Sequence, residues 1–260
     1  MKLAAVGDNC MDVYEQLGRA FPGGNPVNVA VYAVRLGREA AYVGAVGSDQ
    51  YGQLMRQAMA EKGVDISHVH TLPGKTAVTQ VELRGGERVL GDYDEGVLAD
   101  FRLSRQDVDF LCTFDVIHTG LWGKMEQELS RFRARGKLVS FDFATAEDGL
   151  VLETALPQTD YAFFAREEDT PALRRFLMEA KEKGPRVVVA TLGGNGSLAY
   201  DGQTFYTGGI VPVDVVDTMG AGDSYIAGFL TAILSGAILP EAMAAGAANA
   251  SVTLAYQGAW

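Results

Sequence analysis

Short apolar segments alternate with longer amphipathic segments along most of this chain, and no other feature constrains its fold as strongly. Several of the longer segments begin with proline or end with glycine, as helices do. Strands separated by helices form βαβ units, so the sequence predicts an α/β fold with a mostly parallel sheet. The expected strands are 3–6, 40–46, 116–119, 138–143, 161–164 and 187–191, and the expected helices are 25–36, 51–62, 125–135, 172–183, 224–234 and 240–256.

One stretch departs from this alternation. Residues 76–83 and 87–90 are two strand-like runs joined by Arg84-Gly85-Gly86, which predicts a hairpin without an intervening helix. Such an insertion in a parallel fold is often a small lid or an oligomer surface, and an exposed edge hairpin is the alternative. The sequence contains no internal repeat or linker. We therefore expect a single domain over 1–260, with lid segments near 8–22 and 76–98.

Composition and charge narrow the function classes. A net charge of −11 argues against nonspecific nucleic-acid binding, which depends on clustered Lys and Arg. No apolar run approaches the ~20 residues that span a bilayer, and the segment after Met1 is too short for a signal peptide. Cys10 and Cys112 do not form a C-x-x-C unit, which favours a reducing compartment. We expect a cytoplasmic protein that binds neither membranes nor nucleic acids.

The most informative segment is 217–223, which leads directly into an apolar helix. Gly220, Ala221 and Gly222 allow backbone N–H groups at the helix start to point at an anion, which the helix dipole also favours. Asp223 beside such a site suits a base that accepts the proton of a hydroxyl during phosphoryl transfer. The alternative is a glycine turn in which Asp223 merely complements the helix dipole.

A second polar group lies near the N-terminus. Asp8 and Asp12 flank a turn after the first expected strand, and Gly24-Asn25 precedes a helix that carries Asn28. Carboxylates and amides suit the directed hydrogen bonds of sugar hydroxyls. A structural alternative is that these residues cap turns and helices, with Asn25 as the N-cap before Pro26.

Three other motifs are less informative. The glycine turn 191–196 either lets the backbone approach a nucleotide or forms a hairpin turn. Gly74-Lys75-Thr76 lacks the earlier glycine of a phosphate-binding P-loop. His68 and His70 have no third ligand at a plausible spacing, so we interpret them as part of a surface loop rather than a metal site.

Segments 23–28 and 217–230, with 191–196 between them, resemble in order and spacing the signatures of the PfkB, or ribokinase-like, carbohydrate kinases. The resemblance covers nearly the whole chain. It implies a three-layer α/β/α sandwich with a small β-sheet lid that often forms a homodimer, and ATP-dependent phosphorylation of a sugar. It further implies Asp223 as catalytic base, the 220–222 amides as an anion hole, a sugar site of Asp8, Asp12, Gly24, Asn25 and Asn28, and ATP contacts at Thr191, Gly193, Gly196 and Asn249.

Further segments resemble the members of this family that phosphorylate the 6-hydroxyl of glycated amino acids; they are 7–12, 63–71, 79–83, 91–101 and 258–260. Such a substrate carries a secondary ammonium, for which Asp92, Asp94 or Glu95 could supply negative charge, a solvated acidic loop being the alternative. Kinases for plain sugars or nucleosides, and a silent sugar-binding protein, are the other hypotheses.

The chain also departs from the family pattern. Many members carry an Asn-x-x-Glu motif linked to the metal and phosphate, but here residues 165–168 retain only Glu168, as a candidate metal contact. Mg²⁺ is implied by the chemistry itself, and a monovalent cation requirement stays open. Trp122 follows Thr119-Gly120, where some relatives have an acidic residue, and either packs against substrate or belongs to the core or lid.

Overall fold

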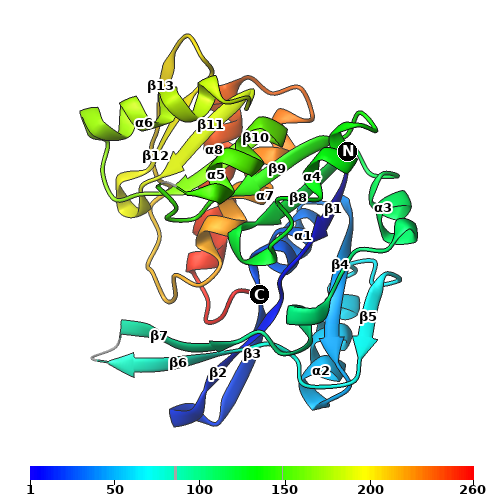
Figure 1. Ribbon diagram of the computed structural model, residues 1–260. Coiled ribbons are helices and arrows are strands. Elements are labelled where there is room, and N and C mark those ends of the chain that lie inside the picture. The colour runs from blue at the N-terminus through cyan, green and yellow to red at the C-terminus, as the bar shows by residue number, and fades with distance from the viewer. Residues whose placement is uncertain (85–86, 148) are drawn as a thin grey trace.

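The computed structural model describes residues 1–84, 87–147 and 149–260, and Figure 1 shows two sheets of different size. Within these residues, nine strands form the larger sheet, in the order β13-β12-β11-β10-β9-β8-β1-β4-β5. Neighbours are parallel from β5 to β11 and antiparallel from β11 to β13. The strands are β1 (Lys2–Val6), β4 (Glu39–Gly47), β5 (Val69–Leu72), β8 (Val116–Gly120), β9 (Leu138–Asp142), β10 (Tyr161–Ala165), β11 (Val187–Thr191), β12 (Ser197–Tyr200) and β13 (Phe205–Gly208).

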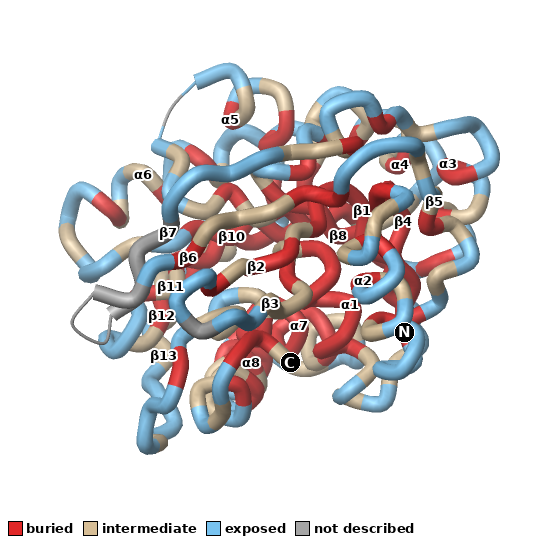
Figure 2. The backbone as a smooth tube through the Cα atoms, turned by 90° about the horizontal axis from the view of Figure 1, so that it is seen from below, coloured by how far each residue is buried: buried red, intermediate tan, exposed pale blue. Residues whose placement is uncertain are grey.

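Helices cover both faces of this sheet. Successive strand residues point to opposite faces, so Leu3 and Ala5 of β1 join one apolar core while Ala4 and Val6 join the other. Figure 2 shows the buried central strands between more exposed outer segments. One core is covered by α1 (Asn25–Arg35), α2 (Gln50–Glu61), α7 (Ala221–Ile233) and α8 (Leu239–Leu254), the other by α3 (Arg105–Leu111), α4 (Leu129–Arg133), α5 (Leu150–Ala155) and α6 (Pro171–Glu182). The predicted three-layer sandwich is confirmed.

The smaller sheet lies below the larger one in Figure 1 and has the order β3-β2-β6-β7. Its strands are β2 (Cys10–Tyr14), β3 (Arg19–Gly23), β6 (Val78–Arg84) and β7 (Glu87–Asp94). They come from the two segments expected to form a lid. The antiparallel pairing of β6 with β7 confirms the expected hairpin strands. The predicted turn residues Gly85 and Gly86 lie outside the described residues.

Two helix predictions need correction. The helix expected over 125–135 is the shorter α4, and α1 begins at Asn25 with Gly24, not Asn25, as its N-cap. No side-chain hydrogen bond caps α1, so the Asn25 amide is available for other contacts. In the described part of the chain, every helix is too short or too polar to span a membrane.

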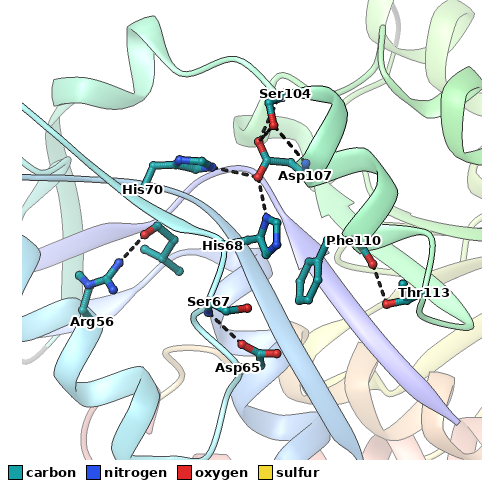
Figure 3. Close-up of polar contacts among 10 residues, drawn as sticks. Arg56, Asp65, Ser67, His68, His70, Ser104, Asp107, Phe110 and Thr113 are labelled. Carbon is teal, nitrogen blue, oxygen red and sulfur yellow. Dashed lines mark hydrogen bonds and ion pairs between the residues drawn. The ribbon is translucent and has the colours of Figure 1, made fainter.

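The surface-loop interpretation needs correction: His68 does lie in the turn before β5, but its ring is partly buried, and His70 belongs to the strand itself. His70 lies in β5 at the edge of the larger sheet, and His68 stacks on Phe110 with 4.0 Å between ring centroids. Figure 3 shows both imidazoles directed at Asp107, whose Oδ1 lies 2.8 Å from His68 Nδ1 and 2.9 Å from His70 Nε2. Asp107 also forms a capping box with Ser104 at the start of α3. The cluster therefore fastens α3 to the sheet edge.

Candidate active site

Several of the predicted polar residues meet at the carboxyl edge of the larger sheet. Asp8 follows β1, and Asp142 ends β9, two strands away. The first turns of α1 and α7 bring Asn25 and Asp223 to the same edge. In open parallel sheets, ligands bind at the carboxyl ends of the strands. The topology therefore gathers side chains from distant parts of the sequence into one site.

Two amides hold the Asp223 carboxylate. Asn25 Nδ2 donates to its Oδ1 and Asn28 Nδ2 donates to its Oδ2, each at 2.7 Å. Burial raises the pKa of Asp223, while the hydrogen bonds from Asn28 and Asn25 act in the opposite direction; the net shift is upward. The carboxylate is therefore fixed in orientation and more basic than an exposed aspartate.

Gly220 makes the entry to α7 possible. Its φ of 72° lies in the left-handed region, and a Cβ there would lie 2.3 Å from Tyr32 Oη. This turn lets α7 begin at Ala221, with Gly222 exposed next to it. The first N–H groups of a helix have no intrahelical acceptor, so this end of α7 can receive an anion beside Asp223.

Asn25 and Asn28 are held in position by further hydrogen bonds. Asn28 Oδ1 accepts from Trp260 Nε1 at 2.7 Å, and Asn25 Nδ2 donates also to Asp142 Oδ2 at 2.9 Å. The amide oxygen of Asn28 and the second N–H of Asn25 thus each have a partner. Neither side chain can flip without losing a hydrogen bond. The amide of Asn25, expected to cap a helix, instead joins two carboxylates.

His118 completes this arrangement from within the sheet. Burial lowers its pKa to about 3, so the ring is neutral at physiological pH. Its Nε2 lies 3.0 Å from Asn25 Oδ1 and its Nδ1 lies 2.9 Å from Ser140 Oγ. Because the amide oxygen only accepts, Nε2 carries the proton and Nδ1 accepts from the serine hydroxyl. His118, Asp142 and Trp260 were not predicted; only Asp142, at the end of an expected strand, gave a usable signal.

The site concentrates negative charge. Burial, followed by the charge of Asp223, raises the pKa of both Asp8 and Asp142 to about 7. Asp8 is only 6% exposed, and its Oδ1 has no hydrogen-bond partner in the described part of the protein. A buried acceptor without a donor is costly, and this oxygen is available to accept a hydrogen bond from a ligand.

Asp12 and Gly24 border the same region from the small sheet and the start of α1. Asp12 is buried in β2, opposite Phe21 of β3. Gly24 has a φ of 105°, and a Cβ there would lie 2.6 Å from Asn9 Cα. The backbone at Gly24 thus packs directly on the turn that carries Asp8, a contact that no side chain would allow.

A cavity of about 550 Å³ lies on the other side of the α7 N-terminus. Ala221 and Gly222 form one wall, and Thr191, Gly193 and Gly196 lie on another. Most of its remaining lining comes from residues 209–213, from Val215 and from α8. None of its described lining residues carries a carboxylate, and its size is that of a small-molecule site. The N-terminus of α7 therefore borders a largely apolar cavity.

The chain resembles known carbohydrate kinases over nearly its whole length. Residues 11–260 match the model of the pfkB family carbohydrate kinases. The chain belongs to the pfkB family. It is 48% identical to fructoselysine 6-kinase of Escherichia coli over 258 residues, with 99% of each chain covered. It is 34% identical to a fructosamine kinase of Bacillus subtilis, covering 100% of this chain and 93% of that one.

The pfkB fold is also found in solved structures. Arabidopsis thaliana ribokinase, complexed with ribose and ATP, superposes with a TM-score of 0.90 over 99% of this chain and 93% of its own. Its sequence identity is 22%. The ribokinase from Thermotoga maritima gives a TM-score of 0.85, also at 22% identity. At such identities the likeness concerns the fold.

Three of the predicted site residues lie away from these sites. Asn249 is buried and donates to Ser224 O at 2.7 Å, so it joins α8 to α7 and does not line the 550 Å³ cavity. Glu168 lines a separate cavity beside α6. Asp92 is exposed on β7 and does not line the cavity next to Asp8, whereas Tyr93 and Glu95 do.

Proposed function

We propose that this chain phosphorylates the 6-hydroxyl of fructoselysine with ATP, giving fructoselysine 6-phosphate and ADP. The observation that carries the proposal is the Asp223 carboxylate, held by Asn25 and Asn28 at the helix start between the sugar-side carboxylates and the apolar cavity. The 48% identity to fructoselysine 6-kinase over nearly the whole chain supports the choice of substrate.

In this reaction the substrate oxygen attacks the γ-phosphorus of ATP as the bond to the ADP oxygen breaks. Asp223 accepts the hydroxyl proton, and its raised pKa makes it a stronger base than an exposed aspartate. The N–H groups at the start of α7 lie where charge develops on the transferring group. Asp8, with its unpartnered Oδ1, accepts from a sugar hydroxyl.

ATP occupies the 550 Å³ cavity in this proposal, with its phosphates at the start of α7 and its base toward α8. The described residues contain no group of three or more metal-ligating side chains, and Glu168 lies at another cavity. Mg²⁺ enters as part of the Mg-ATP substrate, bound mainly by phosphates and water.

Two expectations about context belong to the same proposal. The small sheet ends in the edge strands β3 and β7, and pairing along such an edge would give a homodimer. Light scattering behind a sizing column would show it as a doubled mass. The free thiols Cys10 and Cys112 suit the cytoplasm.

Coupled ADP release with Mg-ATP tests the function directly. We expect strong activity on ε-fructoselysine and little on fructose, ribose or a nucleoside. Activity on one of the plain sugars instead would keep the kinase and discard the substrate, and silence across the panel would discard both.

A further inference from the structure

A second cavity, of about 390 Å³, opens beside the sugar site. Gly7 and Asp8 are among its lining residues, so the cavity adjoins the place where the sugar hydroxyls are proposed to bind. Trp122, Tyr93 and Arg102 are among the side chains that line the rest. Neither proton transfer nor phosphate binding uses these three residues. The cavity therefore has room for a part of the substrate that extends beyond the sugar.

Apart from Asp8, only one charged side chain of this cavity lacks an ion-pair partner among the described residues. Lys124 forms an ion pair with Glu95, and Glu128 forms one with Arg131. Arg102 has no carboxylate partner among the described residues. In a protein of net charge −11, an unpaired guanidinium facing a cavity is a specific local attraction for an anion.

The guanidinium of Arg102 is also held in place. Its Nη1 donates to Ala99 O at 3.0 Å and to Phe101 O at 2.6 Å. Its Nε and Nη2 have no acceptor in the described part of the chain. These two nitrogens form the edge of the guanidinium that receives a carboxylate through two parallel hydrogen bonds. The anion that this edge fits best is therefore a carboxylate.

Two aromatic side chains of the cavity are open to contact. Trp122 is 62% exposed, on the short turn (Leu121–Gly123) after β8, and Tyr93 is 38% exposed on β7. Large exposed aromatics at a cavity present apolar surface that a ligand can cover. A hydrocarbon chain is the ligand group that gains most from such walls.

On the basis of the proposed function, we infer that this cavity binds the amino-acid part of the substrate, with the α-carboxylate of the lysine on Arg102. The lysine methylene chain lies against Trp122 and Tyr93, which spans the cavity from the sugar end to the guanidinium. An α-glycated amino acid would instead place its carboxylate beside Asp8, where negative charge is already concentrated. The contact with Arg102 thus favours substrates that are glycated at the ε-amine over those glycated at the α-amine.

A pair of substrates that differ only in the carboxylate tests this inference. Fructosyl-cadaverine has the same sugar, amine and methylene chain as ε-fructoselysine but no carboxylate. We expect the wild-type enzyme to have a kcat/KM about 10- to 100-fold higher for fructoselysine, the usual effect of a charge-assisted contact. Arg102→Gln should abolish this preference by lowering kcat/KM for fructoselysine, and leave fructosyl-cadaverine within about twofold.

Two further variants complete the experiment. Arg102→Lys should keep part of the preference, because it retains a charge without the paired geometry. Arg105→Gln is the matched control, because it removes a positive charge three residues further along the chain. The Arg105 side chain is 89% exposed and does not line the cavity, so this change should leave kcat/KM for both substrates unaltered. If the wild-type enzyme uses both substrates equally, or Arg102→Gln lowers both by one factor, the inference is overturned and the proposed function stands. If neither fructosamine is phosphorylated, both fall.

Discussion

Two regions of this molecule hold buried carboxylates in opposite electrostatic settings. At the sheet edge, burial raises the pKa of Asp107, but hydrogen bonds from His68 and Ser104, with a further one from His70, outweigh it and bring the pKa to about 2. In the active site, burial and the neighbouring Asp223 raise the pKa of Asp8 to about 7.

The difference lies in the donors. Asp107 accepts from two imidazoles and a serine hydroxyl, so its acceptor capacity is used by the protein itself (Figure 3). Asp8 keeps one oxygen without a donor in the described residues. A carboxylate that the fold satisfies stabilises the fold, whereas one that the fold leaves unsatisfied is available to a ligand.

The largest expected difference between the candidate active site and the Asp107 cluster is in turnover. Asp223→Asn removes the proposed base and should lower kcat by about 10²- to 10⁴-fold, because general-base catalysis contributes that much. Nucleotide affinity, measured by calorimetry, should change little. Asp107→Asn serves as the matched control and should leave kcat within about twofold. Comparable turnover in Asp223→Asn and the wild type would rule out the proposed role.

The second effect is on stability, and here the change at Asp107 should matter more than the change at Asp223. Asp107→Asn should lower the free energy of unfolding by about 3 kcal/mol, since it removes the buried, charged partner of two partly buried rings. Urea unfolding measures this change. Because the pKa of Asp107 is depressed, its contribution is present above about pH 4 and is lost as pH falls toward 2. A variant that unfolds at the wild-type urea midpoint at pH 7 would show that the cluster is dispensable.

The third effect concerns the raised pKa of Asp8. Ionised Asp8 costs stability at neutral pH, so Asp8→Asn should stabilise the free enzyme by about 1 kcal/mol at pH 8. The gain should vanish below about pH 4, where Asp8 is protonated in both states. The same variant should lose affinity for the sugar. Destabilisation at pH 8 would mean that Asp8 already has the donors it needs.

The fourth effect is the pH dependence of kcat/KM. The coupled carboxylates must lose protons for Asp223 to act as a base, so kcat/KM should rise with pH and level off above about 7. Asp142→Asn removes a neighbouring negative charge and should move this rise to lower pH, by less than about one unit. A profile that is flat between pH 5 and 8 would contradict the raised pKa values.

The smallest effect is expected at the rim of the sheet-edge cluster. His70 is 40% exposed, so His70→Ala should cost no more than about 1 kcal/mol. His68→Ala should cost more, because it also removes the stacking on Phe110. The reverse order in urea unfolding would show that stacking contributes little.

The alternation of strands and helices predicted the mostly parallel sheet, and the resemblance to the pfkB kinases implied the three layers of the fold. The sequence also placed Asp223 and its glycines, since these lie together in one segment. It missed partners from distant segments: nothing in the helix at 25–35 indicates that Asn25 contacts Asp142 or His118. The third member of the His68–His70 cluster, Asp107, was missed for the same reason, because topology rather than spacing brings it there.

The pairing of the small sheet bears on the order of folding. Two of its three strand pairings are hairpins between strands that are neighbours in the sequence. The central pairing joins β2 to β6 in parallel, with Met11 opposite Val78. Closing a loop of that length costs chain entropy before any contact repays it. We therefore expect the hairpins to form early and the β2–β6 pairing to form late, after α1, β4, α2 and β5, which lie between the two hairpins in the chain. The wall that carries Asp12 is then among the last parts of the enzyme to become native.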